Sequence, residues 1–123
     1  MNTAVLSVAS NLPQAHEKVL ECLNWLNQVL TGLRCSAIYH TPALKQANTL
    51  YFNAVAQGIT PLDLEQLNAL LKSHEEACGR KSEARARHEV PIDIDIVMWN
   101  GNVVKEKDYQ QSFFQTGWQE LCQ

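Results

Sequence analysis

Residues 92–101 read Ile-Asp-Ile-Asp-Ile-Val-Met-Trp-Asn-Gly, and this stretch decides the fold. Apolar and acidic side chains alternate over its first five positions, which predicts a strand over Ile92–Trp99 with the isoleucines directed into the core. The Asn100-Gly101 pair that follows is typical of a type I′ turn, and it predicts a hairpin that returns through Val103 and Val104. The sequence therefore places a strong buried strand beside a short hairpin strand.

Upstream of this stretch, the apolar pattern changes between a two-residue and a three-to-four-residue period. The two-residue alternation predicts strands over Thr3–Val8, Arg34–His40 and Tyr51–Ile59. The longer period predicts helices from Ala15 to a Gly32 cap, from Thr60-Pro61 to Cys78-Gly79, and in a short tail after Tyr109. The segments Thr41–Leu50 and Arg80–Val90 are predicted loops, and Ala9-Ser10-Asn11 is a predicted turn and helix-capping cluster.

The predicted order of elements is β-α-β-β-α-β, with an added hairpin strand and a short C-terminal helix. Two helices packed on one face of a mainly antiparallel sheet form a ferredoxin-like α+β fold. A chain of 123 residues suffices for one hydrophobic core, so we expect a single domain over residues 1–123.

The composition excludes several functional classes. Ten basic and thirteen acidic residues give a net charge of −3, so the broad basic surface of a nucleic-acid-binding domain is absent. No apolar run approaches the length of a membrane span, and the first residues carry no secretory signal. The four cysteines show no paired spacing, which is typical of reduced thiols. We therefore expect a cytoplasmic protein that binds neither nucleic acid nor membrane.

Asp93 and Asp95 form the strongest candidate site. Alternate residues of a strand share a face, so both carboxylates project together, roughly 6.5–7 Å apart along the chain. Such a pair suits Mg²⁺, which takes one or two carboxylates together with substrate phosphates. The segment from Arg80 to Arg87 holds four of the ten Lys and Arg residues, and cations beside acids are what phosphoryl transfer requires. The alternative is a half-exposed strand with its acids in water and a solvated basic loop.

Asn53 forms the centre of a second candidate cluster. It is a polar side chain in an apolar strand, and its donor and acceptor suit a heterocyclic amide ligand. Tyr51 and Phe113 are candidate aromatic walls for such a ligand. The alternatives are an Asn53 side chain bonded to a neighbouring strand or loop, and aromatic rings that belong to the core.

Several motifs, each on its expected element and in the expected order, resemble those of the 6-hydroxymethyl-7,8-dihydropterin pyrophosphokinases. This family transfers a diphosphate from ATP to a pterin alcohol in folate biosynthesis. The motifs that carry the resemblance are Val8-Ala9-Ser10-Asn11-Leu12, Tyr39-His40-Thr41-Pro42, Tyr51-Phe52-Asn53-Ala54-Val55, Glu75 with Gly79-Arg80, and Ile92-Asp93-Ile94-Asp95-Ile96.

The resemblance implies a role for each matched residue. Asp93 and Asp95 would hold two Mg²⁺ ions against ATP, and Arg80 would neutralise phosphate charge. The implied pterin-binding residues are Thr41, Pro42, Leu44, Tyr51, Asn53 and Phe113, and the implied nucleotide-binding residues are Glu75, Arg80 and Arg87. The partners are then ATP and a hydroxymethyl pterin, and we expect a monomer or weak homodimer.

Three departures from the family pattern concern the phosphate contacts. The family's Arg-Trp-Gly-Pro-Arg stretch reads Ala86-Arg87-His88-Glu89-Val90, and Gln111 stands where an arginine is usual before the phenylalanine. The family's Val-Pro-His segment has no counterpart between Lys105 and Ser112. Fewer cations predict weaker ATP binding and less stabilisation of transition-state charge. A degenerate paralogue that keeps a pterin or nucleotide pocket without turnover is therefore an alternative to the active enzyme. A regulatory or RNA-binding module is a third, disfavoured by the net charge.

Overall fold

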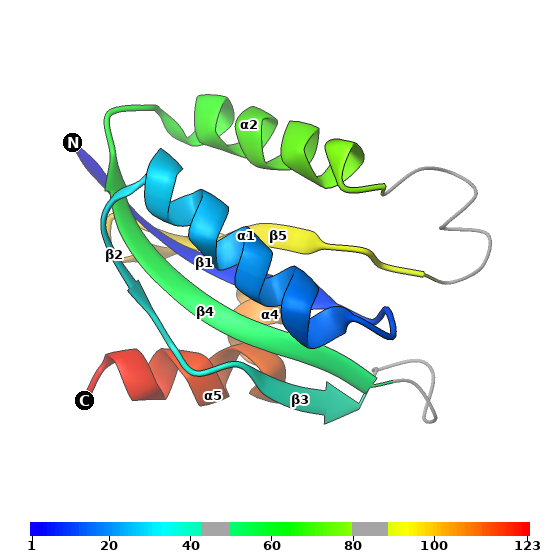
Figure 1. Ribbon diagram of the computed structural model, residues 1–123. Helices are drawn as coiled ribbons and strands as arrows, with labels where there is room; N and C mark the ends of the chain where they lie inside the picture. The colour runs from blue at the N-terminus through cyan, green and yellow to red at the C-terminus, as the bar shows by residue number, and fades with distance from the viewer. Residues whose placement is uncertain (43–49, 80–88) are drawn as a thin grey trace.

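The computed structural model describes residues 1–42, 50–79 and 89–123 (Figure 1). Its elements, in chain order, are β1 (Asn2–Ser10), α1 (Ala15–Val29), β2 (Thr31–Cys35), β3 (Tyr39–Pro42), β4 (Leu50–Thr60), α2 (Leu64–Ala77), β5 (Asp93–Trp99), β6 (Asn102–Val103), α4 (Glu106–Tyr109) and α5 (Ser112–Leu121). None of the helices in these ranges is long and apolar enough to cross a lipid bilayer.

The strands form one sheet in the order β2-β4-β1-β5-β6. β3 pairs with the same edge of β4 as β2 does, but β3 pairs with the first half of β4 and β2 with the second half. The described pairs are antiparallel, and β1 lies in the centre between β4 and β5. Because β2 and β3 together act as one interrupted strand, this order is that of the predicted ferredoxin-like α+β fold, which is confirmed. The predicted hairpin is also confirmed, since Asn100 (φ 51°) and Gly101 (φ 83°) both have the positive φ of a type I′ turn.

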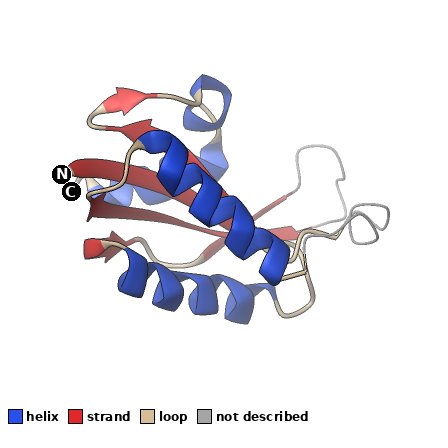
Figure 2. Cartoon of the chain, turned by 90° about the horizontal axis from the view of Figure 1, so that it is seen from above, coloured by secondary structure: helices blue, strands red, loops and turns tan. Residues whose placement is uncertain are grey.

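Alternation along the strands divides the core into two layers. Leu6, Val8, Ile94 and Ile96 face α1 and α2 and belong to the larger cluster. Their neighbours in sequence face the opposite side, where α5 packs on the sheet through Phe114 and Leu121; the strand residues of this second cluster are Val5, Val55, Val97 and Met98. Figures 1 and 2 show α1 and α2 on one side of the sheet and α5 on the other. The sheet is thus covered on both faces.

The predicted single strand Arg34–His40 is wrong, since it is divided into β2 and β3. The interruption lies at Ser36, whose hydroxyl accepts the hydrogen bond of Val55 N at 2.9 Å. A side chain thereby replaces a backbone partner, and regular strand pairing resumes only at Tyr39. The loop predicted over Thr41–Leu50 also begins later than expected, because Thr41 and Pro42 continue β3 and pair with Tyr51 and Leu50.

The predicted helix boundaries need three corrections. The first helix ends at Val29 rather than at a Gly32 cap, because Leu30 turns into the core and packs closely over Gly58. Gly32 (φ 63°) instead lies at an irregularity of β2. The second helix begins after Asp63 rather than at Thr60-Pro61, because Asp63 and Gln66 form a reciprocal capping box. The tail contains two short helices, α4 and α5, where one was predicted.

Ser10 and Asn11 do not cap α1, whose N-cap residue is Gln14. Both side chains instead hold Val90, about eighty positions later in the chain. Ser10 Oγ donates to Val90 O at 3.1 Å, and Asn11 Oδ1 accepts from Val90 N at 2.6 Å. The end of β1 is therefore tied to the segment that leads into β5, which fixes where the acidic strand begins.

Candidate functional site

The register of the sheet brings the two predicted clusters onto one face. Ala9 of β1 lies opposite Asn53 on one side and opposite Asp93 on the other. Directly opposed residues of antiparallel strands point to the same face, so Asp93, Ala9 and Asn53 form a row across three strands. At a strand spacing of 4.7–4.9 Å, the Cα atoms of Asp93 and Asn53 lie roughly 10 Å apart.

Adjacent rows extend this face in both directions. Thr41 lies opposite Tyr51 in one of these rows, and Asp95 lies opposite Ser7 in the other. Tyr39, opposite Asn53, continues the row of Asn53 onto β3. We call the face that carries Thr41, Tyr51, Asn53, Ala9, Asp93 and Asp95 the site face. It is the same side of the sheet that α5 covers, but the coverage is partial. Val55 and Val97 are fully buried there, whereas the side chains of Asp93 and Asp95 keep 30% and 17% of their surface exposed.

Asn53 is tied to β3 by its side chain. Its Nδ2 donates to Thr41 Oγ1 at 2.7 Å and to Tyr51 O at 3.3 Å, and only 1% of the residue is exposed. This is the alternative in which the buried amide bonds a neighbouring strand. Thr41 and Asn53, both predicted for the same pocket, are in direct contact, and the contact fixes the orientation of the amide.

Phe113 reaches the site face from α5. Its carbonyl oxygen accepts a hydrogen bond from the hydroxyl of Tyr39, which in turn accepts from Gly117 N at 3.1 Å. Gly117 has no room for a side chain, because a Cβ atom there would lie 2.6 Å from Val55 and 2.9 Å from the Tyr39 oxygen. Tyr39 therefore docks the start of α5 beside Asn53, with Phe113 half-buried at that junction.

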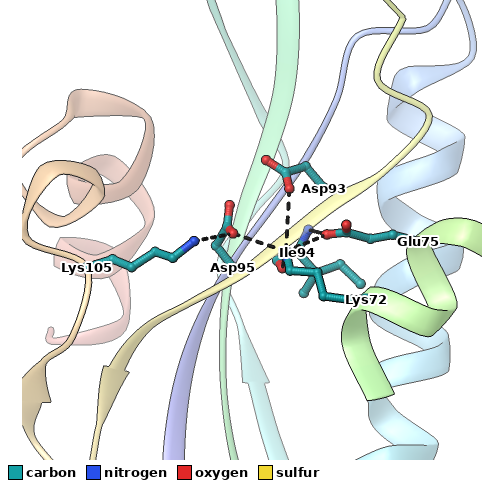
Figure 3. Close-up of polar contacts among 6 residues, drawn as sticks. All are labelled: Lys72, Glu75, Asp93, Ile94, Asp95 and Lys105. Carbon is teal, nitrogen blue, oxygen red and sulfur yellow. Dashed lines mark hydrogen bonds and ion pairs between the residues drawn. The ribbon is translucent and has the colours of Figure 1, made fainter. Parts of the chain in front are cut away.

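The acidic pair is enclosed by two lysines, as Figure 3 shows. Lys72 of α2 places its Nζ 3.2 Å from Asp95 Oδ1 and 4.0 Å from Asp93 Oδ1. Lys105, just beyond the hairpin, donates to the same Asp95 oxygen at 2.7 Å. The two carboxylates and two ammonium groups thus form one ionic cluster at the start of β5.

This cluster sets the charge of Asp95. Burial by itself would raise the pKa of the Asp95 carboxyl, but the hydrogen bond from Lys105 and the charge of Lys72 outweigh it, so its pKa lies below the usual 3.8. Burial opposes the charge of Lys72 as well, yet Asp95 and Glu75 raise the pKa of that ammonium. Both groups are therefore charged at neutral pH. Asp108 of α4 experiences this field too, because burial and the negative charge of Asp95 raise its pKa.

Glu75 lies at the edge of β5 rather than on the site face. Its Oε2 accepts from Ile94 N at 2.6 Å and from Lys72 Nζ at 3.0 Å, and the residue is buried. Ile94 stands between the two aspartates, so Glu75 fixes the peptide that carries them. Its predicted contact with a nucleotide stays a prediction.

The remaining predicted residues are distributed as follows. Pro42 is the last residue of β3, paired with Leu50. Leu44, Arg80 and Arg87 lie outside the described residues. Within the described ranges, no group of three or more His, Cys, Asp or Glu side chains is placed to hold a metal ion. Asp93 and Asp95 supply two carboxylates, a donor set that suits Mg²⁺ when phosphate oxygens complete its coordination.

A comparison against known protein families matches residues 5–123 to the 7,8-dihydro-6-hydroxymethylpterin-pyrophosphokinase family. The chain belongs to this family. A search of curated protein sequences returned no match. Membership implies a pyrophosphokinase of folate biosynthesis, which is a diphosphotransferase that acts on small molecules.

Three residues of this pyrophosphokinase-family site were not predicted from the sequence: Lys72, Lys105 and Asp108. Lys105 left a usable signal, because the hairpin register that pairs Met98 with Val103 returns the chain beside Asp95. Lys72 precedes Glu75 by one helical turn, but its direction toward β5 depends on how α2 packs. Asp108 lies in a four-residue helix with no strong apolar period.

Proposed function

We propose that this chain transfers a diphosphoryl group from ATP to 6-hydroxymethyl-7,8-dihydropterin and releases AMP. One observation carries the proposal: Asp93, Ala9 and Asn53 form a continuous row on the site face. The acids that suit a metal-bound triphosphate and the amide that suits a heterocycle are therefore neighbours across a small residue. A separation of roughly 10 Å between their strands is appropriate for a pterin whose hydroxymethyl group must meet a phosphate.

The reaction exchanges one phosphorus–oxygen bond for another. The hydroxymethyl oxygen bonds to the β-phosphorus, the bond from that phosphorus to the α-phosphate oxygen breaks, and AMP and a proton leave. No covalent enzyme intermediate is needed, so catalysis rests on positioning and on neutralising charge. Two Mg²⁺ ions held by Asp93 and Asp95 would supply most of that neutralisation. Lys72 and Lys105 would add positive charge beside them, and Arg80 and Arg87 are proposed to contribute from the connecting segment.

The pterin is proposed to bind at the Asn53 end of the row. Thr41, Pro42, Leu44 and Tyr51 would surround it, and Phe113 would supply a flat apolar surface for its ring. The hydrogen bond between Asn53 and Thr41 favours this assignment, because it orients the amide before a ligand arrives. The Tyr39 hydroxyl supports it further by fixing Phe113 at the same end of the site face.

A pocket without turnover is the second candidate, and the ionic cluster favours it. Asp95 Oδ1 already accepts from two ammonium groups, and the positions of Val90 and Gln111, where the resemblance expects arginines, carry no charge. Such a protein would bind pterin or nucleotide and release no AMP.

One assay separates the two candidates. AMP release from ATP is measured with Mg²⁺, with and without 6-hydroxymethyl-7,8-dihydropterin, for the wild type, Asp95→Asn and Asp63→Asn. Asp63→Asn is the matched control, since it removes one carboxylate at the start of α2 and keeps a good N-cap. Pterin-dependent AMP that is lost in Asp95→Asn and kept in Asp63→Asn supports the diphosphotransferase. Pterin binding by folded wild-type protein without AMP release would establish the second candidate.

A further inference from the structure

Lys72 and Lys105 share one oxygen of Asp95, but they are held very differently. Lys72 Nζ donates to Glu75 Oε2 at 3.0 Å, to Ile94 O at 2.8 Å and to Asp95 Oδ1 at 3.2 Å. An ammonium group has three donors, so its capacity is filled by three groups on two packed elements. Lys72 is a fixed part of the framework around the acids.

Lys105 is held by a single bond. Within the described residues, its Nζ donates one hydrogen bond, to Asp95 Oδ1 at 2.7 Å, and 47% of its side chain is exposed. The backbone is anchored, because Val104 N and Lys105 N both donate to Val97 O. The root of the side chain is therefore fixed while its flexible stem can swing the ammonium away from Asp95 at little cost.

A divalent ion at Asp95 conflicts with this ammonium. Asp95 Oδ1 already accepts from two ammonium groups, and a divalent ion would add a third cation in a partly buried site, where screening by water is weak. If Lys72 moved away from Asp95, its hydrogen bonds to Ile94 O and Glu75 Oε2 would also break. Lys105 is therefore the group that leaves Asp95 when the metal ion binds. The triphosphate of a nucleotide brings oxygens that accept the released ammonium, since lysine binds phosphate as a mobile point charge.

We propose that Lys105 occupies Asp95 until nucleotide binds and then exchanges this carboxylate for a phosphate oxygen, which makes metal binding dependent on nucleotide. The inference rests on the proposed function for the identity of the nucleotide, and it adds a specific residue and an order of events. Lys105 competes with the free metal ion and assists the metal–nucleotide complex. Removal of its charge must therefore change the two affinities in opposite directions.

The test measures Mn²⁺ binding by electron paramagnetic resonance, first with protein alone and then with ATP present. Lys105→Met removes the ammonium and keeps the apolar stem, and Lys107→Met is the matched control from the exposed side of α4. Without nucleotide, Lys105→Met should bind Mn²⁺ about fivefold more tightly than the wild type, as expected for the loss of one competing ion pair. With ATP, the same variant should bind the Mn²⁺ complex about tenfold more weakly, and Lys107→Met should change neither value.

Unchanged Mn²⁺ affinity in Lys105→Met, or changes of the same sign with and without ATP, would overturn the proposal, since a structural role moves both affinities together. Lys105→Arg gives a second arm if Lys105→Met does not fold, because it keeps the charge and must retain the weak affinity for free Mn²⁺. Neither arm requires turnover. Opposite shifts of the two Mn²⁺ affinities without any AMP release would support the exchange by Lys105 and refute the transferase activity. AMP release without these shifts would support the transferase activity and refute the exchange.

Discussion

Glu75 accepts a hydrogen bond from the backbone nitrogen of Ile94 at 2.6 Å, across 19 positions of the chain. On the same residue, Ile94 O accepts from Lys72 Nζ at 2.8 Å. Among the described residues, β5 has β6 as its outer neighbour only at Met98 and Trp99, so no described strand lies beside its acidic end on that side. The two side chains of α2 take the place of that strand. The segment Asp93–Asp95 is thereby fixed on both edges, which holds its carboxylates on the site face.

Variants of Glu75 test whether the side chains of α2 stabilise β5 in place of a neighbouring strand. Glu75→Ala leaves the buried Ile94 N–H without its acceptor and should lower the free energy of unfolding by about 2–3 kcal/mol. Glu75→Gln keeps an oxygen for Ile94 N and should cost about 1 kcal/mol. Urea denaturation followed by circular dichroism measures both values.

Glu76→Ala is the matched control, because Glu76 is the exposed neighbour on the same helix. It should change the free energy of unfolding by less than about 0.5 kcal/mol. Equal costs for Glu75→Ala and Glu76→Ala would contradict the role assigned to Glu75.

The ionic cluster predicts a specific loss of stability in acid. The pKa of Asp95 is lower in the folded chain than the usual 3.8. Its charge therefore stabilises the fold above about pH 4, and that contribution is lost as the pH falls through the folded value. With EDTA present, Asp95→Asn should be less stable than the wild type at pH 7, and this difference should shrink at pH 3. A difference that is the same at both pH values would refute the charge assignment.

The face shared by Asp93, Asp95 and Asn53 was predictable from sequence in part. Alternation alone places the two aspartates together, because a strand has a period of two. Their position relative to Asn53 follows only from the register that sets Ala9 opposite both Asn53 and Asp93. That register depends on the whole length of β1, which no short motif specifies.

The missed features depend on contacts between distant segments. The interruption at Ser36 requires Val55 N to meet its hydroxyl, and the role of Asn11 requires Val90. The start of α2 was a different kind of error. Asp63 and Gln66 have the spacing of a capping box, but the Thr60-Pro61 pair gives a competing start signal, and the longer β4 takes up Thr60.

The buried hydroxyl of Tyr39 predicts a loss of folding stability at high pH, as Asp95 predicts one at low pH. Burial raises the pKa of its hydroxyl from 10.0 to about 12, although the bond from Gly117 N acts against the rise. Between these pH values the unfolded chain ionises and the folded chain does not, so Tyr39 destabilises the fold as the pH rises above 10. Tyr39→Phe should lower stability by about 1 kcal/mol at pH 8, because it removes the link between Phe113 O and Gly117 N. Thermal unfolding at pH 8 and pH 11 should show this difference narrowing at the higher pH, and a wider difference at pH 11 would contradict it.

Ala9 gives the most direct test of the site face, because it lies between the acids and the amide. Its neighbours Val8 and Ser10 are buried, while Ala9 itself is only half-buried and points to the site face. Ala9→Leu adds three carbon atoms at the centre of the row and should weaken binding of 6-hydroxymethyl-7,8-dihydropterin at least about tenfold, as steric exclusion from a preformed site does. Ala69→Leu, on the exposed side of α2, is the matched control and should leave binding unchanged. Quenching of pterin fluorescence measures both affinities. If folded Ala9→Leu binds the pterin as tightly as Ala69→Leu does, the ligand occupies another surface and the assignment of this face is wrong.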